Sequence, residues 1–154
     1  MKYSIIVAVF NRPDELNELL ESLTLQSFTD FEIIIVEDGS TVSSEAVCAR
    51  YGGRLTIRYF FKDNSGPGPS RNYGCRRASG DYFLFIDSDC TVPPHYLSSI
   101  DAEVSEKGLD AFGGPDREHE RFTPVQKAIS YAMTSFLTTG GIRGGSEKID
   151  KFQP

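Results

Sequence analysis

The sequence lacks the features that mark several large classes of protein. It has no excess of basic residues, because 16 lysines and arginines stand against 22 aspartates and glutamates, a formal net charge of −6. Such a chain is not built as a general binder of nucleic acid or of an acidic membrane surface, so we expect no nucleic-acid partner. No stretch is long and apolar enough to span a bilayer, so we also expect no membrane segment in this chain.

Cysteine is scarce as well. The three cysteines, Cys48, Cys75 and Cys90, form no C-x-x-C pair and leave an odd number. No secretory signal stands at the start of the sequence. Both observations favour a reducing compartment, so we expect a cytoplasmic location, or a membrane-peripheral one in a longer parent protein.

What the sequence does contain is a regular alternation of strand and helix patterns. Its 154 residues are 39% hydrophobic, which is enough for one domain with a core. Apolar runs predict strands over 3–10, 31–36, 55–61, 82–86 and 109–112. Helical spacing of apolar residues, together with capping residues, predicts helices over 14–26, 43–51, 70–78 and 93–106. This order predicts an α/β fold with a mainly parallel sheet flanked by helices.

The most informative stretch is one in which an apolar run ends in two aspartates separated by one serine. The run Tyr82 to Ile86 indicates a buried strand, and Asp87 and Asp89 follow it directly. Ligands of parallel α/β sheets bind outside the carboxyl ends of the strands, so both aspartates are predicted to lie at the mouth of a cleft. Oxygen ligands suit Mg²⁺ or Mn²⁺, which also bridge diphosphates, and the pair therefore predicts a metal site for nucleotide chemistry.

Other polar and aromatic residues are expected at the same edge of the sheet. Phe10 ends the first expected strand and Asn11 follows it, Asp38 follows the second strand, and Arg71 lies where a glycine-rich loop enters a helix. Phe10 can stack on a base, and Asn11 lies beside it as a further candidate for nucleotide binding. Asp38 can accept hydrogen bonds from a base or ribose, and Arg71 can reach a base carbonyl or a phosphate. Asp87 can bind a sugar hydroxyl or the same metal as its neighbour.

Each of these groups also has an ordinary structural explanation. Aspartates after a strand are common in turns and helix caps, and an arginine in the first turn of a helix is usually solvated. The loop from Asn64 to Gly74 has neither the G-x-G-x-x-G nor the P-loop spacing. What favours a nucleotide site is that all the groups occur in order, each at a strand end or a helix start.

Four segments in order resemble family 2 of the glycosyltransferases: Ser4 to Arg12, Gln26 to Ser40, Gly66 to Gly74 and Gly80 to Asp89. The resemblance covers about residues 2–115 and implies a GT-A fold, in which a nucleotide-sugar-binding sheet carries a D-x-D metal site. It implies an enzyme of glycan synthesis that transfers a sugar from a nucleotide diphosphate, usually with inversion. The implied donor is a UDP-sugar, the acceptor a glycan or lipid-linked molecule, and the cofactor Mg²⁺ or Mn²⁺.

The resemblance also implies roles for single residues. Asp38 is similar in position to the aspartate that contacts the nucleotide base, Phe10 to the aromatic residue beside that base, and Arg71 to the arginine of the nucleotide pocket. Asp87 and Asp89 match the first and last positions of D-x-D, with Asp89 the main metal ligand.

The family's catalytic base is expected to be missing from this chain. In the family it is an acidic residue well after D-x-D, where it deprotonates the acceptor hydroxyl. We expect residues 1–115 to form the nucleotide-sugar-binding domain, and 116–154 to begin an acceptor-side region that is truncated at the C-terminus. That region is expected to hold a helix over about 123–138, with an apolar face that is a candidate dimer contact, and then a flexible tail. The base is then expected beyond Pro154.

Two other functions remain open. A nucleotidyltransferase of nucleotide-sugar synthesis shares the α/β plan, but it should carry a glycine-rich phosphate loop after the first strand, where Phe10 to Asp14 contains no glycine. A non-enzymatic binding domain would use the acidic residues only to cap helices. Loss of metal affinity in an Asp87→Ala variant would argue against that second alternative.

Overall fold

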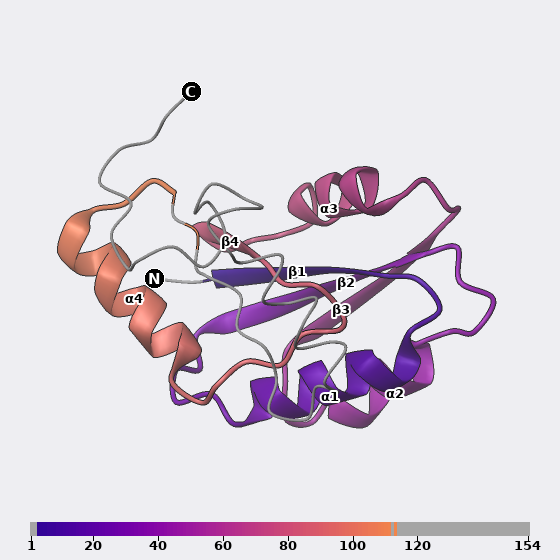
Figure 1. Ribbon diagram of the computed structural model, residues 1–154, viewed down its shortest axis with the longest axis horizontal. Helices are drawn as coiled ribbons and strands as arrows, with labels where there is room; N and C mark the ends of the chain where they lie inside the picture. Colours follow the sequence, from indigo (N-terminus) through magenta and orange to yellow (C-terminus); the bar gives the residue numbers. More distant parts are fainter. Residues whose placement is uncertain (1–2, 112, 114–154) are drawn as a thin grey trace, which may run out of the picture. The chain divides into compact units, whose positions relative to one another are not determined.

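The computed structural model describes residues 3–111 and 113, and a four-stranded parallel sheet lies at its centre (Figure 1). The strands, in the order β3-β2-β1-β4 across the sheet, are β1 (Tyr3–Val9), β2 (Phe31–Asp38), β3 (Ile57–Lys62) and β4 (Tyr82–Phe85). The helices are α1 (Pro13–Thr24), α2 (Glu45–Tyr51), α3 (Pro67–Cys75) and α4 (Tyr96–Lys107). Figure 1 shows α1 and α2 on one face of the sheet and α3 on the other. The predicted α/β fold with a parallel sheet flanked by helices is confirmed.

The core consists of two apolar clusters, one on each face of the sheet, because successive strand residues point to opposite faces. The clusters hold the sheet and its helices together. On one face, strand residues such as Ile5 and Ile33 pack with α1, α2 and α4. The side of α1 that meets them carries four buried leucines at helical spacing: Leu16, Leu19, Leu20 and Leu23. The opposite face has a smaller buried cluster, Ile6, Ile34 and Val36. This two-sided burial explains why β1 and β2 are almost continuously apolar.

Gly74 sets how closely α3 approaches the sheet. A Cβ atom at this position would lie 2.6 Å from Cγ2 of Ile6 and 3.4 Å from Cγ2 of Val36. Because glycine has no side chain there, the helix can pack directly on the two strands. The packing fixes the helix that carries Arg71.

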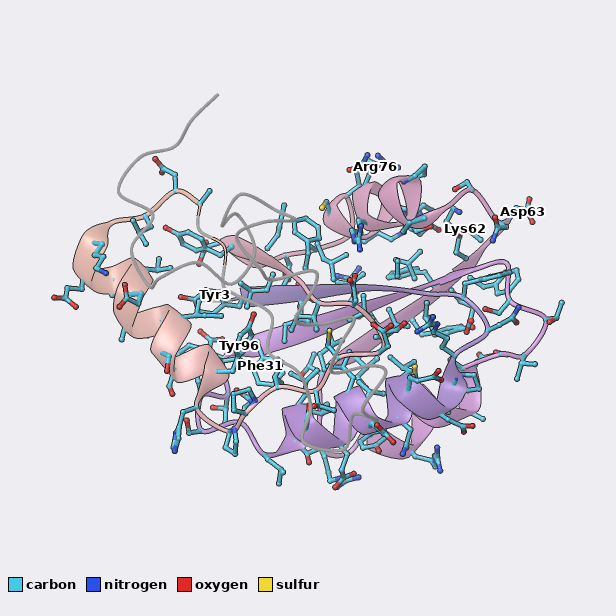
Figure 2. The ribbon with its side chains drawn as sticks, in the orientation of Figure 1. Tyr3, Phe31, Lys62, Asp63, Arg76 and Tyr96 are labelled. Atoms are coloured by element: carbon cyan, nitrogen blue, oxygen red, sulfur yellow. The ribbon has the colours of Figure 1, made fainter. Side chains whose placement is uncertain are left out.

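The end of the sheet opposite the cleft described below is secured by aromatic residues. The Tyr3 hydroxyl donates to Oδ1 of Asp101 on α4 at 2.9 Å, and burial together with that bond raises the pKa of Tyr3. Figure 2 shows Tyr3, Phe31 and Tyr96 on this side of the molecule, and Phe31 and Tyr96 pack against the larger cluster. Among the described residues, no helix combines the length and the hydropathy that a bilayer crossing requires.

The predicted fifth strand over 109–112 is wrong for the residues that the structure describes. Leu109, Asp110 and Ala111 are not in a strand, and the last two are exposed. Gly108, with φ 60°, ends α4 in the left-handed conformation that commonly terminates a helix. The three residues after it offer a single large apolar side chain, which is too little to specify a buried strand.

The element boundaries differ from expectation by one to three residues, and the physical reason is clear at β3 and α3. β3 begins at Ile57 and not at Leu55, because the Leu55 N–H bonds back to the Tyr51 carbonyl at 2.8 Å and extends the end of α2. α3 covers 67–75 instead of 70–78, because Gly66 adopts φ 91° and the next residue is a proline. Proline at the first helical position has its φ already set for a helix. The expected helix over about 123–138, the tail and the dimer contact lie outside the described residues.

Candidate functional site

The carboxyl ends of the strands surround a cleft of ≈ 320 Å³. Its walls come from the last residues of β1 and β2, the segments after β1 and β4, and the first half of α3: Ala8, Val9, Phe10, Arg12, Asp38, Pro67, Arg71, Asp87, Ser88 and Asp89. Parallel pairing of β1 with both β2 and β4 places these strand ends next to one another. The structure therefore brings Phe10, Asp38, Arg71, Asp87 and Asp89 into one cleft.

Asn11 is the one predicted nucleotide-binding residue that does not line this cleft. It adopts φ 53°, and its Oδ1 accepts hydrogen bonds from the backbone N–H groups of Thr41 at 2.8 Å and Val42 at 3.0 Å. Its own N–H donates to Oγ of Ser40 at 2.8 Å. Asn11 thus ties the loop after β1 to the loop after β2, and it presents Phe10, which is 49% exposed, at the cleft.

Glu37 anchors the loop after β2 through its buried side chain. Its side chain is fully buried and accepts from the backbone N–H of Ser44 at 2.7 Å, from the Tyr59 hydroxyl at 3.0 Å and from Oγ of Ser40. Burial and the bond to this carboxylate raise the pKa of Tyr59 to about 12, so the phenol stays a donor at neutral pH. Glu37 is a structural neighbour of the cleft and does not line it.

Asp38 is buried at the end of β2 and organises the start of α3. One carboxylate oxygen accepts from Lys62 Nζ and from the Ser65 N–H at 2.9 Å, and the other accepts from the Gly66 N–H at 2.8 Å. Burial alone would raise the pKa of Asp38, but these bonds outweigh it and lower the pKa below its ordinary value. The carboxylate therefore fixes the glycine-rich loop that leads into the helix of Arg71.

The two aspartates after β4 are each paired with an arginine. Nη2 of Arg71 lies 2.5 Å from Oδ1 of Asp87, and Nη1 of Arg12 lies 2.6 Å from Oδ2 of Asp89. All four side chains keep solvent contact, with exposed fractions between 36% and 63%. Two positive and two negative groups thus line the open part of the cleft, where an anion or a cation from solvent can reach them.

The donor set of these aspartates fits a divalent metal only in company with phosphate. Over the described part of the chain, no group of three or more histidine, cysteine, aspartate or glutamate side chains gathers to hold an ion. Mg²⁺ in phosphate-handling sites commonly takes one or two carboxylates and completes its shell with water and substrate phosphates. Asp87 and Asp89 supply that number of hard oxygen donors, which also suit Mn²⁺.

Sequence reasoning missed two residues of this site. Arg12 lines the cleft, although the pattern Asn11-Arg12-Pro13 indicated only a turn. Lys62, at the end of β3, is the ion-pair partner of Asp38. The signal that would have found both is their place at the carboxyl edge of the parallel sheet: Lys62 ends β3, and Arg12 lies in the short segment between β1 and α1.

The sequence and the fold match a known family of proteins. The sequence matches Glycosyl transferase family 2 over residues 4–143, and the chain belongs to that family. The poly(ribitol-phosphate) beta-N-acetylglucosaminyltransferase TarS of Staphylococcus aureus is 33% identical over 114 residues, covering 71% of this chain and 20% of TarS. The uncharacterized glycosyltransferase YibD of Escherichia coli is 34% identical over 110 residues, covering 71% of this chain and 32% of YibD.

Solved structures show the same architecture. The crystal structure of S. aureus TarS 1-349 in complex with UDP-GlcNAc aligns with a TM-score of 0.68 at 29% identity, covering 85% of this chain and 43% of that one. The mannosyltransferase PcManGT of Pyrobaculum calidifontis, in complex with GDP-Man and Mn²⁺, aligns with a TM-score of 0.56 at 21% identity and shows a likeness of fold. The sheet and its flanking helices therefore form a GT-A fold. The chain spans between 15% and 32% of the length of the curated relatives it matches.

Proposed function

We propose that this chain is the donor-binding part of an inverting, metal-dependent glycosyltransferase and that its cleft binds a nucleoside diphosphate sugar, a UDP-sugar by preference. The observation that carries the proposal is the convergence of an aromatic face, an arginine and two exposed aspartates in one cleft at the carboxyl edge of the sheet. TarS, a relative of this chain, has been crystallised with UDP and with UDP-GlcNAc, which supports uridine as the base.

Each cleft residue has a task that suits its chemistry. Phe10 offers a half-exposed ring on which a base can stack. Arg71 offers a guanidinium to a phosphate or a base carbonyl, once it exchanges Asp87 for that partner. Asp38 holds the loop that places Arg71 and accepts three hydrogen bonds within the protein. The lone pairs that remain on its carboxylate can accept a hydrogen bond from the nucleotide base.

Asp89, with Asp87, would hold Mg²⁺ or Mn²⁺ against the diphosphate. When bound, the metal neutralises charge that develops on the leaving nucleoside diphosphate. The chain's own contribution is to hold the two carboxylates on a short segment directly after β4, where they face the space that Phe10 and Arg71 border. A glycan or lipid-linked acceptor would then approach from the side opposite the leaving group.

Inversion also needs a general base for the acceptor hydroxyl. Asp38, Asp87 and Asp89 are each paired with a cation. We therefore assign the base to a different carboxylate, supplied from outside the described residues.

The Asp89→Ala variant tests the proposal. In calorimetric titrations, the affinity of the wild-type chain for UDP is expected to rise about tenfold or more when Mn²⁺ is added, because the ion would offset the negative charges that the carboxylates and the diphosphate bring together. In Asp89→Ala this gain is expected to disappear, while UDP binding without metal remains, because the variant leaves Phe10 and Arg71 in place.

The matched control is Asp63→Ala, which removes an exposed carboxylate outside the cleft lining. It is expected to keep the full gain from Mn²⁺. If the folded wild-type chain binds no nucleotide of any base, with or without Mn²⁺, the proposal is wrong.

A further inference from the structure

Arg12 stands at a position where helix stability alone would not place it. It is the N-cap of α1, and it makes no side-chain capping bond. Serine, threonine, aspartate and asparagine are preferred there because their oxygens accept a bond from a free N–H, whereas a guanidinium has no acceptor. Its positive charge also lies at the positive end of the helix dipole. A residue that breaks local rules in this way is expected at a functional site.

The geometry shows what the side chain does at that position. Its guanidinium lies 2.6 Å from Asp89, and the exposed fractions of the two side chains are 47% and 48%. The Arg12 backbone is fixed by the first helical bond, from the Leu16 N–H to the Arg12 carbonyl at 3.0 Å. Pro13 fixes its own φ and restricts the backbone of Arg12 before it. The side chain can therefore leave Asp89 and turn to another partner in the cleft without any change in α1.

Charge balance indicates which partner it would take. Three carboxylates at the cleft, Asp38, Asp87 and Asp89, are matched by Lys62, Arg71 and Arg12. A divalent cation alone would add two positive charges to this balanced set and would have to displace a guanidinium from Asp89. A nucleoside diphosphate adds negative charge, and oxygens that a guanidinium can bind in bidentate fashion. Metal and diphosphate together preserve the balance.

We propose that Arg12 is the internal counter-ion of Asp89: it opposes binding of a free divalent metal, and it moves to the diphosphate when metal and nucleotide bind together. This proposal rests on the proposed function of the cleft. It adds a phosphate-binding residue, and it makes metal binding depend on nucleotide binding. The exchange involves no covalent step, because one ion pair breaks as another forms.

The Arg12→Ser variant tests the exchange. It removes the cation and supplies a side chain preferred at N-caps, so α1 keeps its start. Binding of Mn²⁺ alone, followed by the electron paramagnetic resonance signal of the free ion, is expected to tighten about two- to fivefold because the competing guanidinium is gone. Binding of UDP in the presence of saturating Mn²⁺ is expected to weaken about tenfold, because one charge-assisted bond to phosphate is lost.

Two further variants test whether the changes in Mn²⁺ affinity and UDP affinity depend on the charge at position 12. Arg12→Lys keeps the charge and is expected to return both affinities toward wild-type values. Arg54→Ser breaks an arginine–glutamate pair, with Glu21 at 3.5 Å, whose side chains are both 54% exposed and lie outside the cleft lining. It is expected to change neither affinity.

The proposal is overturned if Arg12→Ser binds Mn²⁺ no more tightly than the wild-type chain, or binds UDP equally well when Mn²⁺ is saturating. Failure of the proposed function has a different signature, because it is measured in the wild-type chain alone. In that case the wild-type chain gains no affinity for UDP when Mn²⁺ is added.

Discussion

Replacing Gly74 with alanine is expected to lower the free energy of unfolding by about 2 kcal/mol, the usual cost of overpacking a filled core. The new methyl carbon would lie 2.6 Å from Cγ2 of Ile6, a fully buried side chain whose branched shape leaves it few alternative rotamers. The helix-propensity gain of alanine over glycine, about 1 kcal/mol, offsets only part of that clash. Urea denaturation followed by circular dichroism measures the loss directly.

The same change at Gly53 is the control. A Cβ atom there would meet nothing within 4 Å, so Gly53→Ala is expected to stay within about 0.5 kcal/mol of wild type. Gly74→Val should be less stable than Gly74→Ala, because its extra methyl groups are forced toward Ile6 and Val36. Equal stability of the alanine variants at positions 53 and 74 would show that α3 can rise from the sheet without cost. If α3 moves away from the sheet in Gly74→Ala, nucleotide affinity is also expected to fall, because the helix carries Arg71.

The fold was readable from the sequence because its central strands are buried on both faces. Such strands appear as unbroken apolar runs, and the runs in β1 and β2 gave the right positions within one or two residues. The predicted elements were wrong where only one face of the segment is buried or where the apolar run is short. The three residues after Gly108 hold a single large apolar side chain and form no strand. The start of α3 was missed because Gly66 and Pro67 indicated a loop, although a left-handed glycine followed by proline also begins a helix.

The site was only partly readable, since ion pairs depend on which distant residues the fold brings together. Asp38, Asp87 and Asp89 could be found because they end or follow strands. The prediction that β4 is a buried strand is wrong, because Phe83 and Phe85 are exposed at this edge of the sheet. The cationic partners of the aspartates could not be assigned, because Arg12 and Asp89 are separated by 77 positions and meet only at the edge of the sheet. The function of Asn11 was hidden for the same reason, since its bonds to the loop after β2 span about 30 positions. The type of a residue and its position at the end of a strand predict its chemistry, whereas its ion-pair partner can be identified only from the structure.

Replacing Asp38 with alanine is expected to lower the free energy of unfolding by about 3 kcal/mol, the lower end of the range for breaking a buried ion pair. The change leaves Lys62, whose side chain is only 17% exposed, without its carboxylate, and it leaves the N–H groups of Ser65 and Gly66 without their acceptor. The loss stays at the lower end because the Lys62 amine also bonds to the Asp63 carbonyl and keeps some contact with water. Chemical denaturation at neutral pH measures the effect.

The pH dependence of that loss identifies its cause. The folded state lowers the pKa of Asp38 below its ordinary value of 3.8, so the carboxylate stabilises the fold fully above that value. The contribution is lost as the pH falls through the lower pKa of the folded state. The difference in unfolding free energy between wild type and Asp38→Ala should therefore be constant from about pH 7 to 5 and shrink below pH 3.8.

The control for both measurements is Asp63→Ala, which removes an exposed carboxylate from the segment that follows β3. Figure 2 shows Asp63 at the rim of the molecule, beyond Lys62. This variant is expected to match wild type within about 0.5 kcal/mol at every pH, as surface substitutions usually do. A loss in Asp38→Ala that stays constant down to pH 2 would mean that packing, and not the charged hydrogen bonds, is what Asp38 contributes. In that case the loop before α3 would owe its shape to Gly66 and Pro67 alone, and the lowered pKa would have no part in placing Arg71 at the cleft.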